Sequence, residues 1–375
     1  MIYARGALNM YIHERADWPC FTWDYKVIAG LLADVSYQQG RLLGHMQTAG
    51  LSMRDEAVLQ TLTQDVLKSS EIEGESLHEK QVRSSIARRL GLETAGMVPS
   101  NRNVDGVVEM LVDATQSYRD NLTQDKLFFW HRQLFPVPVS SLGSIRVGEW
   151  RDDASGPMQV VSGPIGRPKV HFEAPVAARI PQEMAAFLTW YNADDDENKV
   201  LKAAVAHLWF LTIHPFDDGN GRLARAITDR MLAKAEDSAL RFYSLSTQIC
   251  HDRKAYYNVL EDTQKGSLDI TKWIQWFLQC FLRALANVDH ILSGVFRRNR
   301  FWNTAASVPL NDRQRLVIGR LLDDFEGKLT SMKWGKLAKC SHDTATRDIN
   351  DLIGKGLLQK DPGGGRSTSY SLIEK

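Results

Sequence analysis

An almost wholly apolar segment, Val200 to Ile213, constrains the fold of this chain more than any other feature. Its composition is typical of a helix that is buried on all sides. The helix cannot continue through Pro215, because the proline ring fixes φ, lacks an N–H donor and biases His214 away from helical backbone. The sequence therefore predicts a buried helix that stops at His214, where a loop begins.

The loop after this helix has the composition of an anion-binding site. The run Asp217-Asp218-Gly219-Asn220-Gly221 is followed by a helix-compatible segment from Arg222 to Ala235. Glycines leave backbone N–H groups unobstructed at a helix N-terminus, an arrangement that favours phosphate. Arg222 and Arg225 are three residues apart and therefore lie on one face of that helix. Each feature alone has an ordinary structural explanation, but together they bring a base, a carboxylate and two guanidiniums to one phosphate-binding turn.

The string His214-Pro-Phe-Asp-Asp218-Gly-Asn-Gly-Arg222-Leu-Ala-Arg225 resembles the HxFx(D/E)GNGRxxR signature of the Fic family, and no position departs from it. The resemblance implies a mainly α fold with a Fic-type helical core. It also implies transfer of AMP from ATP to a hydroxyl on a target protein, or on the enzyme itself, with release of pyrophosphate. Relatives that transfer phosphate carry a lysine where Gly221 stands, so adenylylation is favoured over kinase activity.

The same resemblance implies a role for each residue of the string. His214 would remove the proton of the hydroxyl, since an unperturbed imidazole titrates near neutrality. Asp218 would hold Mg²⁺, a hard cation that prefers oxygen ligands. The other residues would bind the nucleotide: the N–H groups around Gly219, Asn220 and Gly221, with the Asn220 amide, at the α-phosphate, and Arg222 and Arg225 at the β- and γ-phosphates.

A second motif lies upstream. Ser69-x-x-x-Glu73-Gly74 resembles the (S/T)xxxE(G/N) inhibitory motif that some Fic proteins place before their catalytic core. The resemblance implies that Glu73 forms a charge-assisted pair with Arg225 and withholds this arginine from the γ-phosphate of ATP. Without the resemblance, the acidic residues here form a solvated corner between helices. Arg225 would then face Asp229, one turn along its own helix.

The chain divides into three expected domains: an N-terminal helical region that carries the inhibitory motif (1–97), a Fic catalytic core (98–300) and a winged helix-turn-helix (307–375). In the first, a helix-like run extends from Tyr25 to Gln47. Ser76 and Glu79 predict a capping box at the start of the helix that follows the inhibitory motif.

Two short β-prone runs in the core, Met158–Ser162 and Lys169–Phe172, predict a hairpin closed by residues 163–168. Considered alone it is an ordinary surface hairpin, but in the Fic family a flap at this position docks the target segment by main-chain pairing. A helix is predicted from Asp252 to Gln264. The family resemblance places adenosine near it, so Tyr257 is a candidate nucleotide contact, although aromatic residues at such positions more often belong to a core.

The last part of the sequence changes character. Helices are predicted at Leu310–Phe325, Met332–Cys340 and His342–Lys355, followed by a β-hairpin whose turn contains Asp361-Pro-Gly-Gly-Gly365. This order resembles a winged helix-turn-helix, which places its third helix in a DNA groove when it binds DNA. The basic charge of the region is modest, and such domains also dock proteins, so DNA and protein are both candidate partners.

Composition and segment length narrow the remaining possibilities. The net charge of +1 gives no overall signature of a polyanion-binding protein. Four cysteines without a CxxC pair suggest neither a zinc site nor a disulfide framework. No signal peptide and no apolar run long enough to cross a membrane are expected, which is typical of a cytoplasmic protein.

Two other functions are compatible with the same residues. One is a bifunctional enzyme that also removes AMP, in which Glu73 positions a hydrolytic water. The other is a DNA-binding regulator whose Fic core is a sensor or a relic, although a relic is expected to lose one of His214, Asp218 or Arg225, and all three are present. The sequence does not indicate the target protein, the modified residue type or whether the chain forms a homodimer.

Overall fold

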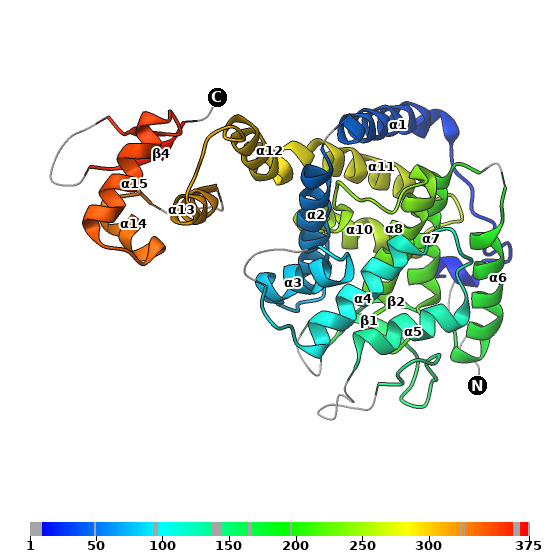
Figure 1. The fold of residues 1–375 in the computed structure, drawn as a ribbon. Helices are drawn as coiled ribbons and strands as arrows, with labels where there is room; N and C mark the ends of the chain where they lie inside the picture. Colours follow the sequence, from blue (N-terminus) through cyan, green and yellow to red (C-terminus); the bar gives the residue numbers. More distant parts are fainter. Residues whose placement is uncertain are drawn as a thin grey trace. The chain divides into compact units, whose positions relative to one another are not determined.

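The computed structural model describes residues 10–48, 50–92, 97–136, 145–163, 167–195, 197–322, 325, 327–362 and 368–373. The fold is mainly helical, as the sequence predicted, with two small antiparallel hairpins in the described part of the chain (Figure 1). The chain forms two compact units, residues 1–49 with 57–288, and residues 50–56 with 289–375. Among the described residues, we find no helix with the length and apolarity that a membrane crossing would require.

Most helices belong to the first unit. They are α1 (Tyr25–Thr48), α2 (Leu51–Ile72, whose first residues belong to the second unit), α3 (Glu79–Arg89), α4 (Arg102–Gln116), α5 (Gln124–Leu134), α6 (Ile180–Asn192), α7 (Lys199–Ile213), α8 (Asn220–Glu236), α9 (Leu245–His251), α10 (Arg253–Gln264) and α11 (Thr271–Ala286). Short 3-10 helices lie at Ile12–Glu14 and Ala177–Arg179, and strands β1 (Gln159–Ser162) and β2 (Lys169–Glu173) form a hairpin.

The predicted central helix is α7, and every residue from Val200 to Ile213 is buried. Asn198 caps its start, since the Asn198 side-chain oxygen accepts from the N–H groups of Val200 and Leu201. Helix α7 packs along α8, and α4, α5, α6 and α11 contact one or the other of these two helices (Figure 1). The helix pair is therefore the core of the first unit, and the loop between the two helices joins a buried helix at each end.

Two helix starts differ from the sequence-based expectation. Helix α8 begins at Asn220 rather than Arg222, which brings Asn220 and Gly221 into its first turn. The predicted capping box of Ser76 with Glu79 is wrong: α3 begins at Glu79, and His78 occupies the N-cap without a side-chain hydrogen bond. Residues 75–78, between α2 and α3, form no helix or strand, so α3 starts later than the serine indicated.

The second unit contains most of α12 (Val288–Thr304), then α13 (Asp312–Leu322), α14 (Ser331–Ala338), α15 (His342–Gly354) and an antiparallel pair, β3 (Leu358–Lys360) with β4 (Tyr370–Leu372). Its core contains the fully buried Trp334, Ile349 and Leu352. Leu329 forms an isolated bridge to Tyr370. The order of helices and hairpin agrees with the prediction, while residues 363–367 of the predicted turn region lie outside the described residues.

Candidate active site

His214 ends α7 in a backbone conformation that few residues other than glycine adopt. Its φ of 51° and ψ of 59° lie in the left-handed region. The His214 N–H donates to the Phe210 carbonyl at 3.0 Å, and the His214 carbonyl accepts from Arg151 Nε at 2.8 Å. The backbone of this residue is thus fixed from both sides of the helix end.

Arg151 fastens this turn to the neighbouring segments. Its buried guanidinium also donates to the Pro175 carbonyl at 2.5 Å and to Asp153 Oδ1 at 2.9 Å, and its main-chain N–H donates to the Pro215 carbonyl at 3.0 Å. One arginine therefore connects the His214 turn to the segment that follows β2. No sequence pattern indicates Arg151, because an arginine in a loop carries no signal for the carbonyls that it will contact.

The partly exposed imidazole of His214 is suited to accept a proton. Its Nδ1 lies 3.2 Å from the Leu211 carbonyl oxygen. Because a carbonyl only accepts, Nδ1 carries the proton of the neutral ring and Nε2 keeps its lone pair. Burial lowers the pKa of His214 to about 4; the Leu211 carbonyl opposes this shift and the Arg151 charge adds to it. The ring is therefore neutral at pH 7, the form that a general base requires.

The loop between α7 and α8 is clamped by Asn220. Its Nδ2 donates to the Phe216 carbonyl at 2.7 Å, and its Oδ1 accepts from the Phe216 N–H at 3.1 Å. Both ends of this buried amide are therefore used within the loop. The expected contact of the Asn220 amide with an α-phosphate stays a prediction, as does that of its main-chain N–H at the start of α8.

His131 supports the same loop from α5. Its ring stacks on Phe216 with centroids 4.2 Å apart and an interplanar angle of 10°. Its Nε2 lies 3.1 Å from the Asp218 carbonyl, and its Nδ1 accepts from the Gly148 N–H at 3.0 Å. Burial lowers the pKa of His131 to about 4, which keeps the ring neutral. No sequence motif singled out this residue, which lies one turn after the buried Leu127 on α5.

Two glycines of the loop, Gly219 and Gly221, lie close to other side chains. Gly219 has a φ of 79°, and a Cβ there would lie only 3.1 Å from the Phe135 ring. At Gly221 a Cβ would lie 2.1 Å from Oε1 of Glu73. The space beside the first turn of α8 is thus filled by a carboxylate, at a helix N-terminus, where anions are stabilised.

Arg225 and the end of α2 form a connected group of contacts. Arg225 Nη2 lies 2.7 Å from Glu73 Oε1, and the same guanidinium donates to the hydroxyl and the carbonyl of Ser69, both at 2.9 Å. Arg225 is 2% exposed. Burial by itself raises the pKa of Glu73, but the charge and hydrogen bond of Arg225, together with the charges of Arg222 and Arg253, outweigh it, and the net shift is downward. The structure therefore places together the three residues Ser69, Glu73 and Arg225 that the two sequence motifs singled out.

A second pair, which the sequence analysis did not anticipate, lies beside the first. Arg222 Nη1 lies 2.8 Å from Glu75 Oε2, and the Arg222 guanidinium also lies over the Phe135 ring at 5.3 Å. Both arginines that could hold phosphates are thus bound by acidic side chains. Ile72, which precedes this segment, is fully buried. The signal that could have found Glu75 is its place two residues after Glu73 in the same acidic run.

The two aspartates of the loop differ in their surroundings. Asp217 Oδ2 accepts from the Arg146 N–H at 2.9 Å, whereas Asp218 is exposed and accepts from the Gly219 N–H through Oδ1 at 2.5 Å. Asp218 thus keeps a second carboxylate oxygen that faces solvent. This is the hard, accessible ligand that Mg²⁺ prefers, and the remaining ligands would come from water and substrate phosphates.

The residues present also fit a polyphosphate. Arg222 Nε and Arg225 Nη1 are buried donors without an acceptor among the residues that the structure describes. Tyr257, on α10, is 39% exposed, and Arg253 lies over its ring at 5.8 Å. Burial raises the pKa of Tyr257, and the nearby negative charge of Glu73 adds to the shift. The candidate nucleotide residues therefore lie within electrostatic reach of one another, around the Glu73 carboxylate.

The hairpin β1–β2 is present as predicted, except that residues 164–166 of its turn lie outside the described residues. Its register shifts between Val160 and Val161, so that His171 has no partner residue in the ladder. At this bulge His171 Nδ1 lies 2.6 Å from Glu261 Oε2 on α10, and its Nε2 lies 2.6 Å from Ser162 Oγ. The hairpin is therefore attached to the helix that carries Tyr257.

Helices α2 and α8 meet in an antiparallel ladder of polar contacts. Glu73 lies over Gly221, Ser69 bonds Arg225, and four residues further along each helix Asp65 bonds Asp229. Asp229 also accepts from Arg241 Nη2 at 2.9 Å. The alternative reading, in which Arg225 pairs with Asp229, is therefore not what the structure shows. The ladder fixes the end of α2 over the start of α8.

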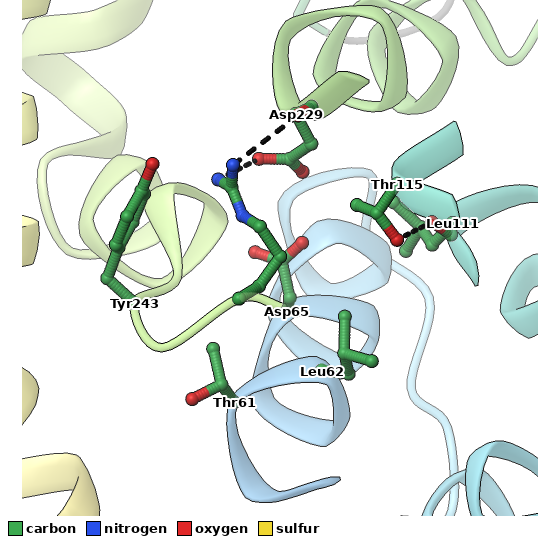
Figure 2. A pocket seen from close by; sticks show the side chains of 8 residues that line it. Thr61, Leu62, Asp65, Leu111, Thr115, Asp229 and Tyr243 are labelled. Atoms are coloured by element: carbon green, nitrogen blue, oxygen red, sulfur yellow. Dashed lines mark hydrogen bonds and ion pairs between the residues drawn. The ribbon is translucent and has the colours of Figure 1, made fainter. Parts of the chain in front are cut away.

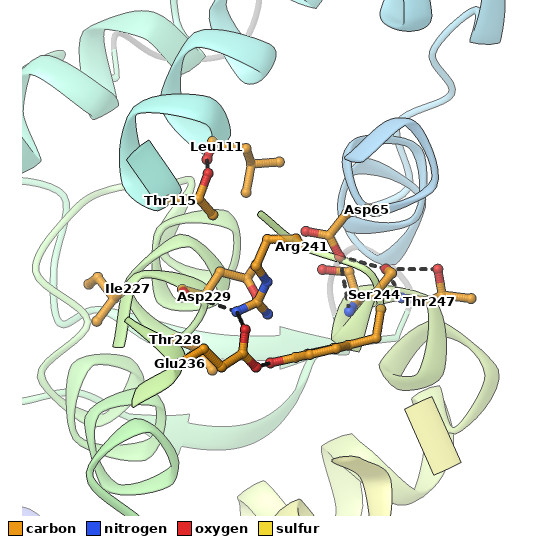
Figure 3. A network of polar contacts seen from close by, with 12 residues as sticks. Asp65, Leu111, Thr115, Ile227, Thr228, Asp229, Glu236, Arg241, Ser244 and Thr247 are labelled. Carbon is orange, nitrogen blue, oxygen red and sulfur yellow. Dashed lines mark hydrogen bonds and ion pairs between the residues drawn. The ribbon is translucent and has the colours of Figure 1, made fainter. Parts of the chain in front are cut away.

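The inner end of the ladder is a buried group of charges. Asp65 and Asp229 face the same small pocket from neighbouring helices (Figure 2), and Arg241 and Glu236 lie close by (Figure 3). Tyr243 and Gln39 donate to Glu236, and Ser244 donates to Asp65 at 2.6 Å. None of the residues lining the pocket belongs to the loop between α7 and α8. The pocket is thus a structural feature behind the candidate site.

The carboxylates of Asp65, Asp229 and Glu236 lie around the single guanidinium of Arg241. Their mutual repulsion makes it unfavourable for all three to be ionised. Burial raises the pKa of Asp229 well above its usual range, and the Asp65 charge raises it further, while Arg241 opposes the shift. The negative charge of Asp65 thus disfavours the ionised form of Asp229.

Asparagine in place of Asp229 should change how stability depends on pH. The folded chain holds the Asp229 proton to a higher pH than the unfolded chain does, because its pKa is raised in the fold. From about pH 4 upward the folded state therefore binds more protons, and this group lowers the free energy of unfolding as pH rises. Denaturant unfolding of both proteins at several pH values should show the wild-type value falling relative to that of Asp229→Asn. Asp34→Asn, at an exposed position of α1, is the control; a pH-independent difference for Asp229→Asn would contradict the raised pKa of Asp229.

Comparison with known proteins identifies part of this architecture. Residues 121–232, which contain the whole loop and both arginines, match the model of the Fic/DOC family. The chain carries a Fic domain. Residues 11–92, which include the end of α2, match a model described as "Domain of unknown function (DUF4172)". The Fic domain thus follows an N-terminal segment that is itself a recurrent unit, and Glu73 and Glu75 belong to that segment.

Curated relatives of the Fic domain are named protein adenylyltransferase Fic. One, from Nematostella vectensis, is 23% identical over 243 residues, which cover 63% of this chain and 51% of the relative. Another, from Culex quinquefasciatus, is 24% identical over 245 residues, which cover 64% of this chain and 44% of that protein. The chain thus spans about half the length of the curated relatives it matches.

Solved structures share the fold. A Fic family protein from Desulfovibrio desulfuricans G20 is 22% identical, with a TM-score of 0.53, over 93% of this chain and 96% of that one. A Fic domain containing signaling protein from Bacteroides thetaiotaomicron is 21% identical, with a TM-score of 0.51, over 72% of this chain and 97% of that one. These likenesses extend beyond the Fic domain and concern the fold alone.

Proposed function

We propose that this protein is an autoinhibited adenylyltransferase, which transfers AMP from ATP to a hydroxyl of a protein, its own chain included. The observation that carries the proposal is the Glu73 carboxylate beside Gly221 and Arg225, at the N-terminus of α8. It occupies a position built for an anion, and a phosphate of ATP is the anion that this signature motif would bind. The names of the curated relatives support this reaction class.

In the proposed reaction, Nε2 of His214 takes the proton of the attacking hydroxyl. The hydroxyl oxygen forms a bond to the α-phosphorus, the bond from that phosphorus to the bridging oxygen breaks, and pyrophosphate leaves. The N–H groups at the start of α8 stabilise charge on the α-phosphate, and Arg222 and Arg225 hold the leaving pyrophosphate. Mg²⁺ at Asp218 would neutralise phosphate charge when bound.

Inhibition in this proposal is a competition for Arg225. While Glu73 holds the guanidinium, the γ-phosphate of ATP lacks its partner, so the nucleotide binds poorly or in an unreactive position. The fully buried Ser69 holds the same arginine and aligns it for Glu73. Gly74 has a φ of 84° and reverses the chain after α2, a geometry that a residue with a Cβ adopts at a cost.

A labelling experiment with Glu73→Gly protein tests the reaction type. ATP labelled at the α-phosphate should label protein, whereas ATP labelled at the γ-phosphate should not, because the γ-phosphate leaves in pyrophosphate. Label from the γ-phosphate alone would show phosphate transfer and overturn the proposal. Loss of the label from modified protein on incubation with wild-type chain would favour the bifunctional alternative, in which Glu73 also positions a hydrolytic water.

The second unit supports a second candidate function, DNA binding through a winged helix-turn-helix. The supporting observation is the order α13, α14, α15 and hairpin around one apolar core. We expect this chain to shift genomic DNA fragments in a gel, with affinity that falls steeply as salt rises, because phosphate contacts release counterions. Absence of a shift at low salt would favour protein docking for this unit.

A further inference from the structure

Glu75 is not part of either signature motif, yet it holds the first arginine of the Fic loop. Its Oε2 lies 2.8 Å from Arg222 Nη1. The Arg222 side chain is 3% exposed, whereas that of Glu75 is 45% exposed. The pair therefore joins a buried cation, which has little access to water, to a carboxylate that is free to leave.

The end of α2 determines where Glu75 lies. Gly74 adopts a left-handed conformation with a φ of 84°, and the Glu75 N–H then donates to the Ser70 carbonyl at 3.0 Å. This is the hydrogen-bond pattern of a Schellman helix end. The chain reverses direction at Gly74, directly after Glu73. The carboxylates of Glu73 and Glu75 therefore reach two arginines that lie three residues apart on α8.

Removal of Glu73 alone would leave half of this arrangement in place. Arg225 would lose its carboxylate, but Arg222 would keep Glu75, and a phosphate would still have to displace that charge. Arg222 also has a buried Nε without an acceptor among the described residues. A buried guanidinium with an unused donor gains more from an anion than an exposed one does, because the interaction is less screened.

We propose that Glu75 is a second inhibitory carboxylate, which competes with a nucleotide phosphate for Arg222 independently of the competition between Glu73 and the same nucleotide for Arg225. The inference rests on the proposed function only in that it takes the competing anion to be ATP. In this proposal one short segment, residues 73–75, blocks both arginines that would bind the phosphates.

The test compares four proteins: wild type, Glu73→Gly, Glu75→Gln and the double variant. Glutamine keeps the length of the side chain and removes its charge, and Glu75 is exposed enough that the fold is retained. Glu71→Gln is the matched control, because Glu71 is an exposed carboxylate in the same segment that pairs with Lys68. Calorimetry with Mg-ATP measures affinity, and incorporation of α-phosphate label measures transfer.

We expect Glu75→Gln to tighten ATP binding roughly 5-fold, and the double variant to bind tighter than Glu73→Gly by a similar factor, with more label incorporated. Equal affinity and labelling of Glu73→Gly and the double variant would overturn the inference and leave the proposed function intact. Tighter binding in Glu75→Gln without labelling in any protein would support Glu75 as a barrier to the nucleotide and count against the transfer reaction. An equal gain in Glu71→Gln would reduce the effect to net charge and overturn the inference.

Discussion

Replacing Glu73 by glycine should raise self-modification with ATP by about 10- to 100-fold, the range of a typical coupling between two ligands that compete for one site. The reason is the 2.7 Å contact between Glu73 Oε1 and Arg225 Nη2, which the substitution removes. The loss of the carboxylate also opens the space beside Gly221, where an anion would meet the N-terminus of α8. Incorporation of α-phosphate label into the purified chain measures the effect.

Glu71→Gly is the control for this experiment. It removes the same charge and introduces the same residue two positions earlier, at a carboxylate that pairs with Lys68 instead of Arg225. Labelling should stay at the wild-type level in this variant. If labelling rises as much in Glu71→Gly as in Glu73→Gly, the activation reflects a loosened helix end. If labelling rises in neither variant, Glu73 is not inhibitory.

Replacing His214 by alanine in the Glu73→Gly background should lower transfer by about 10²- to 10⁴-fold, the usual contribution of a general base. Affinity for ATP should change little, because the proposed phosphate contacts come from α8 and not from the imidazole. Burial keeps the pKa of His214 at about 4, so the base form is already present at pH 7 and its loss is felt across the neutral range. Single-turnover labelling and calorimetry with ATP separate the two quantities.

His251→Ala serves as the control, since His251 is exposed at the end of α9. The left-handed backbone at 214 adds a second check, because alanine tolerates it less well than asparagine. His214→Asn should therefore retain the fold at least as well as His214→Ala and lose transfer equally. Activity retained in both variants would exclude His214 as the base.

Local signals in the sequence were sufficient for the elements that carry the site. Pro215 predicted the end of α7 at His214, and the glycines predicted an unobstructed start for α8, because each acts on the backbone within a few residues. The motif at Ser69–Gly74 predicted the partner of Arg225 only through family resemblance. Glu73 and Arg225 are 152 residues apart in the sequence. No local periodicity indicates that two residues so far apart will be in contact.

The features that the sequence did not reveal depend on tertiary partners. Arg151 holds the His214 carbonyl from a loop, and its role follows from where that loop packs. Asp229 contacts Arg241 and Asp65 instead of Arg225, because the segment after α8 and helix α2 place these two residues beside it. Likewise the Asn220 amide is used to close the loop, a competition between local and ligand contacts that composition cannot settle.

The burial of Ile72 limits how often the inhibited protein releases Glu73 and Glu75. Both carboxylates are released if the final turn of α2 frays, and the only apolar anchor between Ser69 and Gly74 is this isoleucine, which is fully buried. Exposing it costs about 1.5–3 kcal/mol. From this side chain alone, the frayed form is disfavoured by roughly one to two orders of magnitude. The basal activity of the inhibited enzyme would then depend on how often this one helical turn unfolds. A smaller residue at position 72 would raise that basal activity without changing any charged group.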